Sequence, residues 1–199
     1  MPFWLNSVNC KRMEFKDYVP TRVLHDFVGR IEKLGIAYML TGSMAMIRYT
    51  VFRQTADADI ILALDFTHRE KLIDALEPVY YVPHQAVSRA VETHGMFNVI
   101  HQETAFKVDC VLPKPDEFHK NAFAKREKTD YYGREIWVIS KDDLIISKLW
   151  WARDSHSEMQ LRDVKNLMRA GFVAEYVEKW TNQIGVGGLF SQCRREIEE

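Results

Sequence analysis

Two aspartates separated by one residue are the clearest sign of chemistry in this sequence. Asp57 and Asp59 precede the apolar run Ile60-Ile61-Leu62, which is typical of a buried strand. Side chains at positions i and i+2 of a strand point to the same face, so the two carboxylates would lie together. Like charges repel, and one or two Mg²⁺ ions would balance them through the oxygen ligands that this cation prefers. The alternative is an ordinary Asp-x-Asp turn at an exposed strand start, and the pattern by itself favours that alternative.

A third carboxylate interrupts a later apolar run. Asp109 lies within the segment 106–112, which otherwise suits a buried strand. An unpaired ionised carboxylate is costly to bury, so Asp109 needs a cation, a metal ion or solvent beside it. Lys107, on the same strand face, is the alternative partner. We expect Asp109 to be the third metal ligand, together with Asp57 and Asp59.

A Gly-Ser pair precedes these carboxylates in the chain. Gly42 and Ser43 follow a short apolar segment and open a helical one. A turn of this kind at a helix N-terminus presents backbone N–H groups and a hydroxyl to an anion, and a triphosphate would suit it. The alternative is purely structural, because glycine is a good turn residue and serine a good N-cap.

The elements that would position these residues alternate between helices and strands. Helical spacing of apolar residues predicts an amphipathic helix over 23–34, and Gly35 follows it as a C-terminal cap. Segment 80–94 shows no clear pattern. The other elements expected in this half are a strand at 36–40, a helix from 43 to about 52, a strand at 57–64, a helix at 67–76, and two strands at 97–100 and 106–112 that form a hairpin.

Beyond residue 112 the pattern becomes mostly helical. The expected elements are a helix at 117–124, a small hairpin that turns at Gly133 and ends in 136–139, helices at 144–153, 161–169 and 173–180, and a short final helix from 185. Ser140 and Asp143 resemble a capping box before the first of the later helices. The sequence thus predicts an α/β (α+β) fold with a mixed sheet. Its core would span 1–112, and a hairpin and helical portion over 113–199 would pack on that core.

Composition limits the class of protein. The 199 residues are 47% hydrophobic and 28% charged, as in an ordinary globular domain. A net charge of −1 argues against coating of bulk DNA through a globally basic surface. The three cysteines have no disulfide or zinc spacing, and no apolar run approaches the ~20 residues of a membrane helix. We therefore expect a cytoplasmic protein without a membrane partner.

The segment 40–60 resembles the signature of the nucleotidyltransferase superfamily typified by DNA polymerase beta. In that superfamily a Gly-Ser helix start is followed by an Arg-x-Thr-x loop, an Asp-x-Asp pair and a third Asp on a later strand. The corresponding residues here, in the same order, are Gly42-Ser43, Arg53-Gln54-Thr55, Asp57 and Asp59, and Asp109. The similarity covers roughly residues 36–112. Thr41 replaces the more common first glycine, and the usual glycine before Arg53 is missing.

The resemblance implies a metal-dependent transferase. An acceptor hydroxyl would attack the α-phosphate of a nucleoside triphosphate (NTP) in line, and pyrophosphate would leave, with Mg²⁺ or Mn²⁺ held by the three aspartates. Gly42 and Ser43 would hold the β- and γ-phosphates, and Arg53 and Lys148 would neutralise developing charge. The acceptor stays open between an RNA end such as that of tRNA, a protein hydroxyl and a small molecule such as an antibiotic.

The C-terminal half is similar to the AbiEii-type toxins and minimal bacterial nucleotidyltransferases, in which a helical lysine and a later aspartate join the active site. Lys148 and Asp163 occupy those positions, and either Asp109 or Asp163 would accept the acceptor's proton. A toxin–antitoxin role would follow. The alternatives are a solvated Lys148 and an Asp163 paired with Arg162 or Lys165.

Two further alternatives remain open. The chain could be a non-catalytic nucleotide-binding or partner-binding module, such as a toxin–antitoxin component, that keeps the fold without turnover, although its intact set of carboxylates favours an enzyme. Trp150 and Trp151 could be core residues with one exposed face, or a platform for stacking a base. The seven histidines show no metal-binding spacing.

Overall fold

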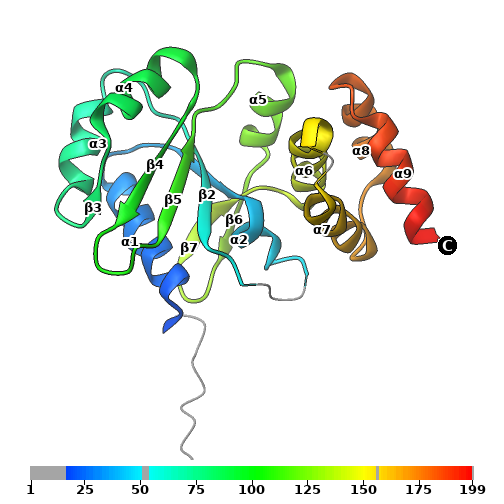
Figure 1. Ribbon diagram of the computed structural model, residues 1–199, viewed down its shortest axis with the longest axis horizontal. Coiled ribbons are helices and arrows are strands. Elements are labelled where there is room, and N and C mark those ends of the chain that lie inside the picture. Colours follow the sequence, from blue (N-terminus) through cyan, green and yellow to red (C-terminus); the bar gives the residue numbers. More distant parts are fainter. Residues whose placement is uncertain (1–16, 51–53, 156, 199) are drawn as a thin grey trace, which may run out of the picture.

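The described part of the chain folds around a mixed seven-stranded sheet (Figure 1). The computed structural model describes residues 17–50, 54–155 and 157–198. The strands are β1 (Tyr38–Thr41), β2 (Asp57–Leu62), β3 (Tyr80–Tyr81), β4 (Met96–His101), β5 (Lys107–Val111), β6 (Glu127–Asp130) and β7 (Glu135–Val138), in the spatial order β3-β4-β5-β2-β1-β7-β6. Pairs β2–β5 and β1–β7 are parallel, and the other neighbours are antiparallel. The predicted mixed-sheet α/β class is confirmed.

Helices cover the sheet and extend beyond it. They are α1 (Val19–Lys33), α2 (Gly42–Met46), α3 (Arg69–Leu76), α4 (His84–Thr93), α5 (Glu117–Ala124), α6 (Lys141–Ser155), α7 (Glu158–Arg169), α8 (Ala174–Gln183) and α9 (Gly187–Glu198). Figure 1 shows α6 to α9 grouped at one end of the molecule, and α3 and α4 at the other. Within the described ranges, no helix is both long enough and apolar enough to cross a membrane.

The two faces of the sheet differ in burial. Along β2, Ala58, Ile60 and Leu62 are fully buried, while the alternating residues, beginning with Asp57 and Asp59, are partly exposed. Helix α1 packs behind β2 on the buried side. The other side of β2 and β5 stays open, and α6, which contacts α2, stands beside it. The strand period therefore separates a core face from a face available for chemistry.

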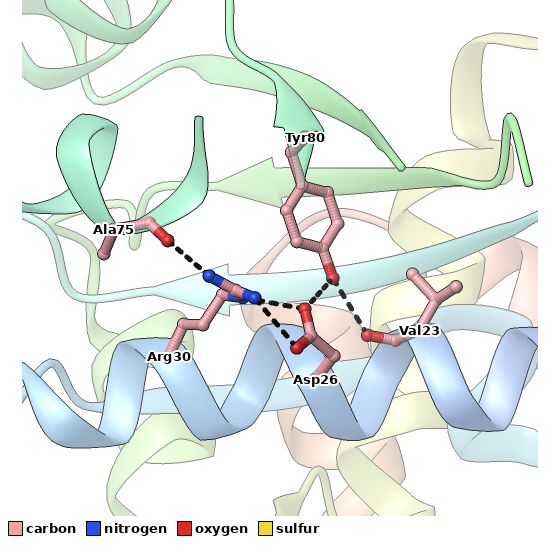
Figure 2. Close-up of polar contacts among 5 residues, drawn as sticks. All are labelled: Val23, Asp26, Arg30, Ala75 and Tyr80. Atoms are coloured by element: carbon pink, nitrogen blue, oxygen red, sulfur yellow. Dashed lines mark hydrogen bonds and ion pairs between the residues drawn. The ribbon is translucent and has the colours of Figure 1, made fainter. Parts of the chain in front are cut away.

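A polar network fastens α1 to its neighbours on the buried side (Figure 2). Arg30 donates to the Ala75 carbonyl at the end of α3 at 2.8 Å, and it also forms an ion pair with Asp26. The Tyr80 hydroxyl, from the edge strand β3, donates to Asp26 and to the Val23 carbonyl. Burial would raise the pKa of Asp26, but hydrogen bonds from Arg30 and Tyr80 outweigh burial and lower it. The Asp26 carboxylate thus stays ionised and connects Arg30 with Tyr80.

The C-terminal hairpin belongs to the same sheet. Strand β7 runs parallel to β1, with Leu40 opposite Val138, so residues assigned from sequence to the portion after 112 extend the core sheet. Helix α6 starts at the expected cap: the Ser140 hydroxyl donates to the Asp143 carboxylate at 2.7 Å and accepts from the Asp143 N–H. Leu144, Ile145 and Leu149 of α6 are fully buried.

Two segments differ from expectation. The unassigned segment 80–94 contains the two-residue strand β3 and helix α4, separated by Pro83, and so short a strand has no detectable period. The helix expected to run to about residue 52 ends at Met46, because Arg48 and Tyr49 donate to carbonyls three residues earlier and tighten the chain into turns.

Candidate active site

Strand register brings the three predicted aspartates onto one face. On the parallel pair β2–β5, Asp59 lies opposite Asp109, and Asp57 lies opposite Lys107. Residues paired in this way point to the same side of a sheet. The carboxylates from two distant parts of the sequence therefore meet on the open face.

The register also arranges the open face in transverse rows. One row is polar and crosses β1, β2, β5 and β4; its members are Thr41, Asp59, Asp109 and Asn98. The adjacent row is apolar; its members are Met39, Ile61, Val111 and Met96. Asn98, opposite Asp109, was not singled out from the sequence, because one polar residue in an alternating strand is ordinary. Asp59 and Asp109 thus lie in the middle of a polar row that ends at Thr41 and Asn98, and the apolar row lies next to it.

Lys107 is the only cation within ion-pair distance of these carboxylates among the described residues. Its Nζ lies 2.8 Å from Oδ2 of Asp109 and 3.6 Å from Oδ2 of Asp57, and the hydrogen bond to Asp109 raises the pKa of Lys107. The structural alternative foreseen for Asp109 is therefore present. However, Oδ1 of Asp109 is buried and has no hydrogen-bond partner in the described part of the chain. One ammonium group leaves this carboxylate half satisfied.

The surroundings of Asp59 disfavour its ionised form. Its pKa is raised to about 6, first by burial and then by the nearby charges of Asp57 and Asp109, while Lys148 and Lys107 oppose the rise. No ready-made cluster of three His, Cys, Asp or Glu ligands occurs within the described ranges. Excess negative charge and an unsatisfied buried oxygen nevertheless suit a divalent cation, which prefers carboxylate oxygens.

Asp59→Asn should stabilise the metal-free protein at alkaline pH. Because the folded pKa lies above the ordinary value, the native state binds the proton more tightly than the unfolded state. Stability linked to Asp59 is thus fully present below about pH 4 and is lost as the pH rises through 6. The variant removes this loss, which is at most about 3 kcal/mol.

Urea denaturation in EDTA at pH 8 and pH 4.5 measures this difference. The gain should be clear at pH 8 and small at pH 4.5. Asp74→Asn, on the exposed side of α3, is the matched control and should change neither value. An Asp59→Asn protein no more stable than wild type at pH 8 would show that neither burial nor the neighbouring carboxylates disfavour the ionised form of Asp59.

Gly42 places the start of α2 against Asp59. Its φ is +65°, in the left-handed region, and a Cβ at this position would overlap the Asp59 carboxylate. Only glycine fits both conditions. The N-cap residue is Thr41, so the interpretation of Ser43 as the N-cap is wrong. Ser43 is the second residue of α2 and directly follows Gly42, the residue that lies against Asp59.

Lys148 and Asp163 form a buried ion pair between α6 and α7. Lys148 Nζ lies 3.0 Å from Oδ2 of Asp163 and 3.2 Å from Oε1 of Gln160. The two residues are 4% and 1% exposed, so the interpretation of Lys148 as a solvated side chain is wrong. Lys165, one of the partners considered for Asp163, instead pairs with Glu196 at 2.8 Å.

A cleft of about 480 Å³ joins these groups. From the sheet and α2 it is lined by Thr41, Gly42, Ser43, Asp59, Ile61, Met96 and Val111, and from the C-terminal helices by Leu144, Ser147, Lys148, Trp151, Ser157 and Gln160. Four of the predicted site residues thus share one cavity. Asp57 and Asp109 flank Asp59 on the sheet, Asp163 lies behind Lys148, and Arg53 lies outside the described residues.

The comparisons with known proteins rest on structure. No sequence-family model and no curated protein matches the chain. The solution structure of the antibiotic-resistance factor ANT(2'')-Ia is similar with a TM-score of 0.57 and 14% identity, covering 89% of this chain and 94% of that one. Its crystal structure in complex with adenylyl-2''-tobramycin has a TM-score of 0.55 and 15% identity, covering 82% of this chain and 95% of that one. The crystal structure of an antigenic nucleotidyltransferase-like protein from Paracoccidioides brasiliensis has a TM-score of 0.54 and 13% identity, covering 86% of this chain and 90% of that one.

These similarities show the fold. The chain has the fold of the nucleotidyltransferases, as the resemblance of segment 40–60 predicted. At identities of 13–15% they carry no statement about substrate. The AbiEii-type assignment stays a prediction.

Proposed function

We propose that this protein is a nucleotidyltransferase that moves a nucleoside monophosphate from an NTP to a hydroxyl acceptor and releases pyrophosphate. The observation that supports this most is the meeting of Asp57, Asp59 and Asp109 on the open sheet face, directly beside the start of α2. The fold shared with ANT(2'')-Ia is consistent with it.

The three carboxylates would hold Mg²⁺ or Mn²⁺. Asp59 has its pKa raised to about 6 by burial and by the other two carboxylates, and Asp109 has a buried oxygen without a partner among the described residues. When bound, the cation supplies positive charge at the reacting phosphate and at the attacking and leaving oxygens. The side chain of Lys107 is partly exposed, and it would move away from Asp109 when the cation binds.

We place the triphosphate between α2 and α6, which line the same cleft. The backbone at Gly42 and the hydroxyl of Ser43 would bind the β- and γ-phosphates. Lys148 lines the same cleft and would bind the phosphates through its Nζ while Asp163 holds it in place. Arg53 would add a further positive charge, as the resemblance implies.

Asp109 is the better candidate for the proton acceptor. The acceptor oxygen forms a bond to the α-phosphorus, the bond to the β-phosphate oxygen breaks, and the hydroxyl proton passes to a carboxylate. Asp109 lies opposite Asp59 on the open face, whereas Asp163 is enclosed and paired with Lys148. We therefore assign Asp163 to positioning Lys148 rather than to proton transfer.

Ser43→Ala should weaken NTP affinity by about tenfold through loss of one hydroxyl contact with phosphate. Since Ser43 is not the N-cap of α2, little stability should be lost. Isothermal titration with a non-transferable NTP analogue measures the affinity. Ser191→Ala, on the exposed side of α9, is the matched control. Unchanged NTP affinity in Ser43→Ala would remove this residue from the phosphate site.

Three classes of molecule are candidates for the acceptor. A tRNA or other RNA end, a protein hydroxyl and an antibiotic-like small molecule each offer the required hydroxyl. The related ANT(2'')-Ia structure contains an adenylylated antibiotic, which keeps small molecules among the candidates. A cytoplasmic location and a toxin–antitoxin role stay predictions from sequence.

Labelled substrate transfer tests the proposed function. The protein is incubated with Mg²⁺ and each NTP labelled at the α-phosphate, separately with RNA, protein and small-molecule pools. The proposal expects label to enter one pool, and the Asp57→Asn/Asp59→Asn protein to transfer none. Tight NTP binding without transfer to any pool would favour the non-catalytic nucleotide-binding module instead.

A further inference from the structure

Two large apolar side chains are exposed inside the cleft. Trp151, on α6, is 54% exposed, and Met96, on β4, is 51% exposed. Both line the cavity that also contains Asp59 and Lys148. Scattered exposed apolar residues need no explanation, but two at one cleft mark a binding surface.

Neighbouring side chains hold the Trp151 ring in position. Trp150 packs edge-on against it with ring centroids 5.1 Å apart. Trp150 is itself held by two cations, since Lys114 Nζ lies 3.9 Å and the Arg153 guanidinium carbon 3.8 Å from its ring centroid. A supported ring loses little conformational entropy when a ligand stacks on it.

Spacing along α6 indicates which part of the substrate meets Trp151. Lys148 and Trp151 are three residues apart and share a helix face, about 5–6 Å from one another at Cβ. Under the proposed function Lys148 binds the phosphates, and Trp151 lies one turn further along the same cleft, where it could meet the nucleoside. On the sheet side, the apolar row containing Ile61, Val111 and Met96 lies next to the carboxylates. A planar ring between these walls would remain beside the reacting phosphate.

We propose that Trp151 is the platform on which the base of the NTP stacks, with Met96 covering the base from the sheet side. This inference rests on the proposed function. Every nucleobase has a π-face, so the platform favours nucleotides over bare polyphosphate without choosing among the bases. It also assigns one of the two predicted roles of the Trp150-Trp151 pair: Trp151 contacts substrate, and Trp150 supports it.

Binding of two kinds of probe tests this inference. The probes are the α,β-methylene analogues of the four NTPs, which cannot be transferred, and inorganic tripolyphosphate, each titrated calorimetrically with Mg²⁺. Trp151→Ala should weaken every analogue that the wild type binds by about tenfold or more, and Trp151→Phe by no more than about threefold. Tripolyphosphate should bind both variants as it binds the wild type. Phe66→Ala, at an exposed aromatic outside the cleft lining, is the control and should change nothing.

Other outcomes separate the two proposals. Unchanged analogue affinity in Trp151→Ala would overturn the stacking platform and leave the proposed function standing. Equal losses for analogues and tripolyphosphate would show a general disturbance of the cleft and would also overturn it. A wild type that binds neither analogues nor tripolyphosphate would contradict the proposed function, and the stacking platform with it.

Discussion

Replacing Asp57 with Asn is expected to reduce nucleotide transfer by about a thousandfold or more, because a cation ligand and one unit of charge are lost at the reacting centre. Asp57 sits at the start of β2 on the open face, opposite Lys107, and is partly exposed. The substitution preserves shape and removes no core volume, so the free energy of unfolding should change little. Steady-state kinetics and urea denaturation of the same preparation measure the two quantities.

Two control variants show whether the loss belongs to Asp57 as a ligand. Asp74→Asn, on the exposed side of α3, should keep full turnover. Lys107→Gln removes the ion-pair partner of Asp57 and Asp109 and should keep most of the turnover. If Lys107→Gln were as inactive as Asp57→Asn, the carboxylates would act through their ion pair with Lys107. If Asp57→Asn retained the wild-type rate, Asp57 would have no part in the reaction.

The second large effect concerns Lys148. If Lys148 binds phosphate more strongly in the transition state than in the ground state, its removal should lower kcat/KM by roughly a hundredfold. Burial complicates a simple alanine substitution. Lys148→Ala would leave the Asp163 carboxylate buried and unbalanced by its partner, at a cost of about 3–5 kcal/mol of stability.

A charge-free pair avoids that complication. Lys148→Met/Asp163→Asn removes both charges while nearly preserving volume, so its stability should stay near that of the wild type. The hundredfold loss in kcat/KM should persist in this variant, because the phosphates no longer meet a cation. Wild-type kcat/KM in a folded double variant would show that the pair only joins α6 to α7.

Much of the sheet follows from local pattern, but the site depends on pairing that no local pattern contains. The apolar runs beside Asp57 and around Asp109 predict strands, and the strand period predicts the face that each carboxylate occupies. That Asp59 lies opposite Asp109 follows from parallel pairing of β2 with β5, two strands separated by α3, α4 and the strands β3 and β4. The expectation that they meet came from the cost of burying Asp109 without a cation and from the family resemblance, and not from periodicity.

The C-terminal helices show the same limit. The sequence left a solvated Lys148 as an alternative, and no local pattern indicated that α7 would cover Lys148 with Asp163 and Gln160. Likewise, composition could not separate the roles of Trp150 and Trp151, because their exposure depends on how α6 stands over the sheet. Burial of polar groups by distant elements is a tertiary property.

Pyrophosphate release tests the central claim most directly. The wild-type protein, given each NTP in turn with and without Mg²⁺ and with the acceptor pools, should release pyrophosphate from at least one NTP only when Mg²⁺ is present. The Asp57→Asn protein should release none above background. A correctly folded wild type that binds NTP but releases no pyrophosphate under any of these conditions would contradict the assignment as a nucleotidyltransferase.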